Sequence, residues 1–212
     1  MIIAGLILIG FHIFLAHSEE EFILKEYIMN GSLEEVIDSE ERPVYWNSYE
    51  ETGGKYLGDL LPKNWLFQIH NASPAITMGI DSNIKHSGKY SIKIINGCEK
   101  DIGVIQNIDL IEIKPDTVYI FSCYVKGENV SGKGGVTACV SFASKAGGFW
   151  ADPNRITVWF DKSLSGTFDW KKIEIKFSTN SESEIMLIGG QFRHASGLAW
   201  FDDFSLVEYY GG

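Results

Sequence analysis

After residue 18 the chain consists of short runs in which apolar and polar side chains alternate. In the run 118–127, Tyr119, Phe121, Cys123 and Val125 alternate with residues that are mostly more polar. A period of two is typical of β-strands with one buried face, and the chain shows almost no helical period. The pattern predicts strands at 22–29, 75–80, 90–95, 103–110, 118–127, 135–143, 156–160, 170–178, 184–193 and 198–208.

The segments between the predicted strands are rich in Gly, Ser, Asn, Asp and Pro, which favour turns. About ten strands joined by such turns predict an all-β fold, a β-sandwich of the jelly-roll type. Residues 35–64 are less regular but contain several aromatic side chains, so we expect an irregular loop that covers one end or face of the sandwich. The length of 212 residues suits a single domain over 19–212.

The first 18 residues carry no charged side chain and are mostly aliphatic. This apolar stretch is short for a membrane span of about 20 residues. Ala16, His17 and Ser18 form a small-x-small pattern in front of three glutamates, as at a signal cleavage site. We therefore expect an export signal and a secreted or cell-surface protein. Because no Lys or Arg precedes the apolar run, an uncleaved N-terminal anchor and a misplaced start codon are the alternatives.

The charge of the chain is strongly acidic, with 28 acidic and 18 basic residues and a net charge of −10. This balance argues against nucleic acid and anionic membrane surfaces as partners. Cys98, Cys123 and Cys139 lack the spacing of a zinc or redox motif, and we expect small buried apolar side chains with at most one disulfide. We expect the chain to be a monomer.

Five segments, in this order and spacing, resemble the carbohydrate-binding modules of the CenC type, which group with families 4, 9, 16 and 22. They are 30–35 (NGSLEE), 86–92 (HSGKYSI), 114–127 (KPDTVYIFSCYVKG), 166–172 (GTFDWKK) and 200–206 (WFDDFSL). The resemblance runs from about residue 30 to residue 208. It implies a β-sandwich of the galactose-binding-domain-like type and a non-catalytic domain that binds polysaccharide or oligosaccharide. The segment 35–64 departs from this family, because it is longer than the usual connection before the tryptophan at position 65.

Asp202 and Asp203 are adjacent carboxylates in the last predicted strand, which raises the question of glycoside hydrolysis. Neighbours on a regular strand point to opposite faces, so these two would not flank one glycosidic bond. Strand parity places Asp202 on the inward face with Phe204 and Leu206, where a buried carboxylate needs a compensating partner.

The family resemblance suggests that this partner is a structural calcium ion. It implies ligands from Glu34, from the turn between Ser87 and Lys89, and from Asp202. Hard oxygen ligands of this kind suit Ca²⁺. The alternative is that Glu34 and Asp202 are ordinary carboxylates at the edge of the surface.

A sugar site of this fold class needs aromatic faces and a few well-placed polar groups. Alternation places Gln106, Tyr124, Gln191 and Arg193 on outward faces of their strands, and we expect them to share one sheet surface. The loop tryptophan Trp150 and the strand-initial Trp65 are the aromatic candidates, each with packing as the alternative role. The predicted ligand-binding residues are Trp65, Gln106, Tyr124, Trp150, Gln191 and Arg193.

Two other functions remain open from the sequence. The first is a structural or adhesion β-sandwich at the cell surface that has no sugar site. The second is an enzyme, but the chain contains no Ser-His-Asp set, no G-x-S-x-G or H-E-x-x-H motif and no phosphate-binding glycine loop. A pair of distant carboxylates such as Glu34 and Glu50 would be the remaining catalytic option. The prediction is therefore a non-catalytic domain, either one that stands alone or one that is part of a larger glycoside-degrading protein.

Overall fold

The computed structural model describes residues 25–41, 53–70, 76–99, 102–146 and 148–210. The described residues form β-strands and a single short 3₁₀ turn, η1 (Ser39–Glu41), and none of them forms an α-helix. No helix in this part of the chain would be long and apolar enough to cross a bilayer. The predicted all-β sandwich is confirmed.

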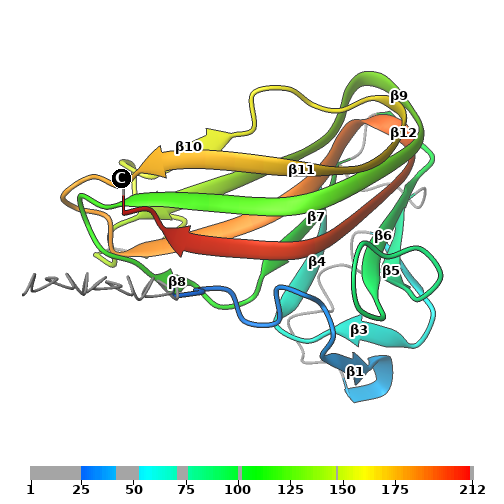
Figure 1. The fold of residues 1–212 in the computed structure, drawn as a ribbon, viewed down its shortest axis with the longest axis horizontal. Helices are drawn as coiled ribbons and strands as arrows, with labels where there is room; N and C mark the ends of the chain where they lie inside the picture. The colour runs from blue at the N-terminus through cyan, green and yellow to red at the C-terminus, as the bar shows by residue number, and fades with distance from the viewer. Residues whose placement is uncertain (1–24, 42–52, 71–75, 100–101, 147, 211–212) are drawn as a thin grey trace, which may run out of the picture.

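Two long strands form the centre of the molecule. β9 (Val118–Ala143) has 26 residues and β12 (Ile185–Glu208) has 24, and they pair antiparallel along nearly their whole length. Both strands curve over at one end of the molecule and continue into the opposite layer (Figure 1). Each of them therefore contributes a central strand to both sheets of the sandwich.

The first sheet is built on the second half of β9 and the first half of β12. Gly189 of β12 pairs with Cys139 of β9 on one side and with Gln106 on the other. The flanking strands are β4 (Trp65–His70), β7 (Ile102–Asn107), β8 (Ile111–Glu112) and β10 (Ile156–Trp159).

The second sheet is built on the other halves of the same two strands. Leu206 of β12 pairs with Phe121 of β9, and Phe201 pairs with both Val125 and Ile92. The flanking strands are β2 (Lys55–Leu57), β5 (Ile76–Asp81), β6 (Ser91–Asn96) and β11 (Gly166–Ser178), and a separate small sheet joins β1 (Val36–Asp38) to β3 (Leu60–Pro62).

The core lies between the two sheets and follows the predicted alternation. In β9 the side chains of Tyr119, Phe121, Cys123 and Val125 are fully buried. Burial of large aromatic and aliphatic side chains of this kind provides most of the stabilising free energy of a sandwich.

The bend in β9 and β12 replaces two turns that the sequence pattern predicted. The glycine-rich segment 131–135 does not end a strand, because β9 continues through it. Gly132 has a φ of 147°, and a Cβ there would lie 2.5 Å from the carbonyl oxygen of His194 on the partner strand. His194 itself has a φ of 51°, and the pairing register shifts on both sides of Ala195. Glycine and local bulges thus bend the strands without ending them.

Two further expectations need correction. The segment 35–64 is not simply an irregular loop, because its described part contains β1, η1, β2 and β3; residues 42–52 lie outside the described residues. The predicted strand at 22–29 is a single bridge, Glu26 to Val207, within its described part. There the Glu26 carboxylate accepts hydrogen bonds from the Leu206 amide at 2.8 Å and the Ser205 hydroxyl at 2.6 Å. Together with the hydrogen bond from the Tyr27 amide to the Leu206 carbonyl at 3.1 Å, this side chain holds the segment to the last strand.

Candidate functional site

The outward face of the first sheet carries cross-strand rows of polar and aromatic side chains. One row runs in register from Leu66 through Gln106, Gly189 and Cys139 to Trp159. A side chain placed this way lies next to those of its row neighbours, because paired residues on one face are about 5 Å apart. The five strands thus bring together residues that are up to 123 positions apart in the chain, from Leu66 to Gly189.

The next row of the same face is more polar. Gln68 pairs with Val104, Val104 with Gln191, and Gln191 with Thr137. The Gln191 amide nitrogen lies 3.7 Å from the Cys139 sulfur. Burial raises the pKa of the Cys139 thiol to about 12, so this cysteine is a neutral part of the surface and not a nucleophile.

A hollow of about 150 Å³ lies on this face, and we call it the groove. Its walls combine amides, hydroxyls and two indoles, and none of the side chains lining it is acidic. The lining residues are Gln68, His70, Val104, Gln106, Cys139, Ser141, Trp150, Thr157, Trp159, Leu187, Ile188, Gly189 and Gln191.

Trp150 and Trp159 are the exposed aromatic surfaces of the groove. The exposed fraction is 65% for Trp150 and 39% for Trp159, whereas Trp65 and Trp200 are essentially buried. Tryptophans as exposed as these are uncommon on the surface of a folded protein, because burial of such a large apolar side chain is favourable. These two are therefore the groups best suited to cover the apolar face of a ligand.

The loop that carries Trp150 is held in place from beneath. Phe149 is buried against Ala143 and Ile185, and its ring lies edge-on to the Trp150 ring at 5.1 Å. The Asp152 carboxylate accepts hydrogen bonds from the Ser144 amide at 2.9 Å and the Asn154 amide at 2.8 Å. The loop thus presents Trp150 from an anchored base.

Each exposed tryptophan is also covered by an arginine. The Arg193 guanidinium carbon lies 4.6 Å from the centre of the Trp159 ring, and that of Arg155 lies 5.0 Å from the centre of the Trp150 ring. Stacking of a guanidinium on an indole is attractive and fixes the orientation of both groups.

The structure brings four of the six predicted ligand-binding residues to this face. Gln106, Trp150 and Gln191 line the groove, and Arg193 lies beside it on Trp159.

The other two predicted ligand-binding residues lie elsewhere. Trp65 is fully buried and donates its indole N–H to the Asn30 carbonyl at 3.0 Å, so its assignment as a ligand residue is wrong. Tyr124 lies in the first half of β9, which belongs to the second sheet, and its ring stacks on His86 at 3.6 Å. The expectation that it shares a sheet face with Gln106 and Gln191 is also wrong, because the bend in β9 separates them.

Several groove residues were not predicted. Gln68 and His70 lie on β4, a strand that was predicted only from its start at Trp65. The sequence does contain evidence for this strand, because the buried Trp65, Phe67 and Ile69 alternate with outward residues. The alternation begins directly after the irregular segment 35–64 and was therefore not recognised as a strand. Trp159 lies in a short alternating run, and the alternation alone does not show which face of this strand packs against the core.

The predicted calcium ligands gather at the turn 86–90. The Glu34 carboxylate accepts the amide N–H groups of Lys89 at 2.8 Å and Tyr90 at 3.3 Å. The Asp202 carboxylate is fully buried and accepts the amide of His86 at 2.8 Å and that of Ser87 at 3.2 Å. Burial raises the pKa of Asp202 to about 6 in spite of these hydrogen bonds.

Strand parity did not predict correctly the position of the second carboxylate. Asp203 has a φ of 47° and lies in a bulge of β12, so it does not point away from the turn. Its carboxylate contacts His86 Nδ1 at 2.6 Å and accepts the Ser87 hydroxyl at 2.8 Å. Both aspartates therefore face the same turn, and Asp202 is inaccessible to a sugar chain.

The donors at this turn fit a metal ion only in part. Three carboxylates, Glu34, Asp202 and Asp203, approach one five-residue turn, which concentrates negative charge there. Among the described residues, however, no group of three or more His, Cys, Asp or Glu side chains is arranged to hold a metal. Any ion there would need main-chain oxygens to complete its coordination.

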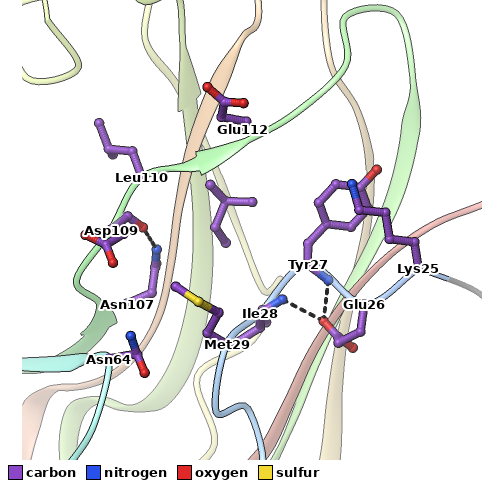
Figure 2. A pocket seen from close by; sticks show the side chains of 11 residues that line it. Lys25, Glu26, Tyr27, Ile28, Met29, Asn64, Asn107, Asp109, Leu110 and Glu112 are labelled. Atoms are coloured by element: carbon purple, nitrogen blue, oxygen red, sulfur yellow. Dashed lines mark hydrogen bonds between the residues drawn. The ribbon is translucent and has the colours of Figure 1, made fainter.

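A second hollow, of about 270 Å³, lies between the segment 25–29 and the connection from β7 to β8 (Figure 2). The Tyr27 hydroxyl bonds to the Glu208 carboxylate and its ring lies edge-on to Tyr119, so this ring is not an open aromatic surface. The Glu26 carboxylate caps the amides of Tyr27 and Ile28, both at 2.9 Å. Although it is larger than the groove, this hollow lacks an exposed aromatic face, and we interpret it as a packing seam.

Comparison with known families identifies the chain. The model of the carbohydrate binding domain family (CBM_4_9) matches residues 63–189, which is more than half of the sequence. The chain belongs to this family. The function of the carbohydrate-binding domain is therefore the binding of carbohydrate, and the sequence-based prediction of carbohydrate binding is confirmed. The matched segment includes β4, β7 and β10 and the groove residues of β9 and β12 up to Gly189.

Solved structures agree with this assignment at the level of the fold. The carbohydrate-binding domain is similar to the enzymatically active domain of tailspike protein 4 of bacteriophage CBA120, with 10% identity, a TM-score of 0.56 and coverage of 87% of this chain. It is also similar to the CBM22-1–GH10 modules of Clostridium thermocellum endo-1,4-beta-D-xylanase 10B, solved with xylohexaose, with 12% identity, a TM-score of 0.50 and coverage of 69%.

The chain spans only 21% and 26% of the lengths of these two structures. A family 61 module in complex with β-1,4-galactotriose matches with 17% identity and a TM-score of 0.46, over 87% of this chain and 99% of that one. None of the curated proteins matches the chain.

Proposed function

We propose that the carbohydrate-binding domain binds a polysaccharide chain in the groove of the first sheet. The observation that carries this proposal is the position of Trp150 and Trp159, two exposed indoles over a hollow lined with amides and hydroxyls. Indole faces cover the apolar sides of sugar rings, and glutamine amides such as Gln106 and Gln191 donate to and accept from sugar hydroxyls.

The groove does not contain the groups that glycoside hydrolysis requires. That chemistry needs two carboxyl groups about 5 to 9.5 Å apart on either side of the bond, and none of the described lining residues is Asp or Glu. A non-catalytic role, in which the domain holds polysaccharide for other activities, follows from this composition. The alternative of a structural or adhesion domain without a sugar site is disfavoured by the two exposed indoles.

Affinity electrophoresis in gels that contain xylan, β-glucan, galactan or mannan tests this function. Trp150→Ala and Trp159→Ala should each lower the affinity for the polysaccharide about tenfold, and the protein should be retarded less in the gel. This loss corresponds to about 1.4 kcal/mol for one aromatic contact. Tyr209→Ala is the matched control, because Tyr209 has the same 39% exposure as Trp159 and is not one of the groove residues. Unchanged retardation of both tryptophan variants would refute the groove as the binding site.

We also propose a structural calcium ion at the turn 86–90. The support is the convergence of Glu34, Asp202 and Asp203 on one turn, in a position where a cation would offset their mutual repulsion. Main-chain carbonyls near Ser87 and Lys89 would supply the remaining ligands, as the resemblance to CenC-type modules suggests. The ion would stabilise the domain and would not contact the groove.

We propose further that the domain acts outside the cell. This proposal rests on the apolar segment 1–18 and on the polysaccharide ligand, and the segment itself lies outside the described residues. N-terminal sequencing of the exported protein would test it, with cleavage after Ser18 as the expected result.

A further inference from the structure

Two arginines lie beside the groove, against its exposed tryptophans, in a protein that is otherwise acidic. The chain has a net charge of −10 and only three arginines, Arg42, Arg155 and Arg193. Both arginines that the structure describes are stacked on the two exposed tryptophans of the groove. The lining residues add His70 and no carboxylate. The distribution of arginine therefore coincides with the proposed binding surface.

These two arginines are not neutralised by ion pairs in the described part of the chain. Lysines elsewhere on the surface pair with acids, as Lys63 does with Glu35 at 2.9 Å and Lys126 with Asp169 at 2.7 Å. No such pair is found for Arg155 or Arg193 among the described residues.

Arg155 also has unused hydrogen-bonding capacity. Its Nη1 is buried and has no acceptor among the described residues. The charge of Asp152 interacts with that of Arg155, but the two carboxylate oxygens of Asp152 accept the amides of Ser144 and Asn154. A buried donor without an acceptor is costly, so the Arg155 guanidinium keeps hydrogen-bonding capacity that the described residues do not use.

The geometry of a stacked guanidinium favours a carboxylate as the acceptor. Each guanidinium carbon lies 4.6 to 5.0 Å from the centre of an indole ring, and the planar fork of N–H donors of a guanidinium matches a planar acceptor. A carboxylate accepts two of these hydrogen bonds in parallel, and such charge-assisted pairs are about twice as strong as neutral ones. The hydroxyls of a neutral sugar offer neither the charge nor the paired geometry.

We propose that the groove selects acidic polysaccharides, in which uronic acid carboxylates bind to Arg155 and Arg193 while sugar rings cover Trp150 and Trp159. This inference rests on the proposed function and names the class of ligand for the same site. Recognition is electrostatic in part, so it weakens as salt screens the exposed charges.

The test compares each acidic polysaccharide with its own neutral form. Glucuronoxylan, polygalacturonate and alginate are used intact and after reduction of their carboxyl groups to alcohols, alongside neutral xylan, β-glucan and galactan. At least one intact acidic polymer should bind about tenfold more tightly than its reduced form, as expected for the loss of a charge-assisted hydrogen bond. Addition of 0.5 M NaCl should reduce that difference.

Variants locate the effect. Arg193→Gln and Arg155→Gln should each remove most of the preference for the intact polymer while binding of its reduced form persists. Lys176→Gln is the control, because Lys176 is also a cation stacked on an aromatic ring, Tyr209, and is not one of the groove residues. Melting temperatures confirm that each variant is folded.

The outcomes separate the two proposals. Equal binding of intact and reduced polymers, or binding of neutral polymers only, would overturn the acidic preference and leave the groove as a sugar site. Failure of all the polymers to bind would overturn the proposed function, and the preference with it.

Discussion

The protonation of Glu208 is controlled by the groups that surround its carboxyl. Its side chain is almost fully buried at the end of β12, where it bonds to the Tyr27 and Tyr210 hydroxyls and to Lys114 at 2.8 Å. Burial alone would raise the pKa of this carboxyl, but the hydrogen bonds from Lys114, Tyr210 and Tyr27 outweigh it and lower the pKa to about 2. The ionised form is therefore stabilised by folding.

This pKa predicts how stability changes in acid. A carboxylate with a folded pKa near 2 and an unfolded pKa of about 4.3 stabilises the fold above pH 4.3, and this stabilisation of at most ~3 kcal/mol disappears as the pH falls towards 2. Urea denaturation between pH 5 and pH 2 should show a shallower decrease for Glu208→Gln than for the natural protein. Glu182→Gln, at an exposed glutamate, should keep the natural slope. Parallel curves for Glu208→Gln and the natural protein would contradict the assignment.

At the scale of the element, the bend in β9 and β12 decides which residues share a face. Except at the bulge around Asp203, alternation correctly predicted inward and outward residues on each side of the bend, such as Phe121 and Tyr124 before it and Gln191 after it. The sequence did not indicate that the strands continue through the bend, because glycines such as Gly132 and Gly134 are equally typical of turns. Tyr124 was assigned to the wrong sheet for this reason.

The bend itself can be tested through Gly132. Gly132→Ala places a Cβ against the His194 carbonyl and the Ala195 Cα, and we expect it to lower the free energy of unfolding by 2 kcal/mol or more, estimated as roughly the cost of backbone strain plus a clash. Gly58→Ala is the matched control, because Gly58 also has a positive φ, of 77°, but its added Cβ would meet nothing within 4 Å. Equal losses in both variants would show that the close approach at the bend contributes nothing.

At the scale of the whole molecule, the class of fold and the family followed from the sequence, whereas the composition of the site did so only in part. Long alternating runs identify strands, and the family motifs lie in those strands. The neighbours of each strand depend on long-range pairing, which leaves no local trace: Trp159 and Gln106 are 53 positions apart and lie in the same row. Trp65 resembled a surface residue because its burial depends on Asn30 and Phe204.

The proposed calcium ion also acts at this scale, because Glu34 and Asp202 come from opposite ends of the described chain and meet at the turn 86–90. Chelation with EDTA should lower the melting temperature by several degrees, since an ion that binds only the folded state stabilises it by mass action. Added Ca²⁺ should restore the natural value, and Glu34→Gln should reduce the response to both treatments. A melting temperature that does not respond to EDTA in the purified domain would exclude a structural ion.

The sharing of β9 and β12 between both sheets has a consequence for synthesis on the ribosome. β12 is the last strand of the described chain, and it supplies a central strand to each layer. The first layer cannot be completed until the first half of β12, which separates β7 from β9, has left the exit tunnel, and the second layer cannot be completed until the second half, which separates β6 from β9, has followed. The nascent chain must therefore keep its apolar strands from aggregating until almost all of the domain has been translated.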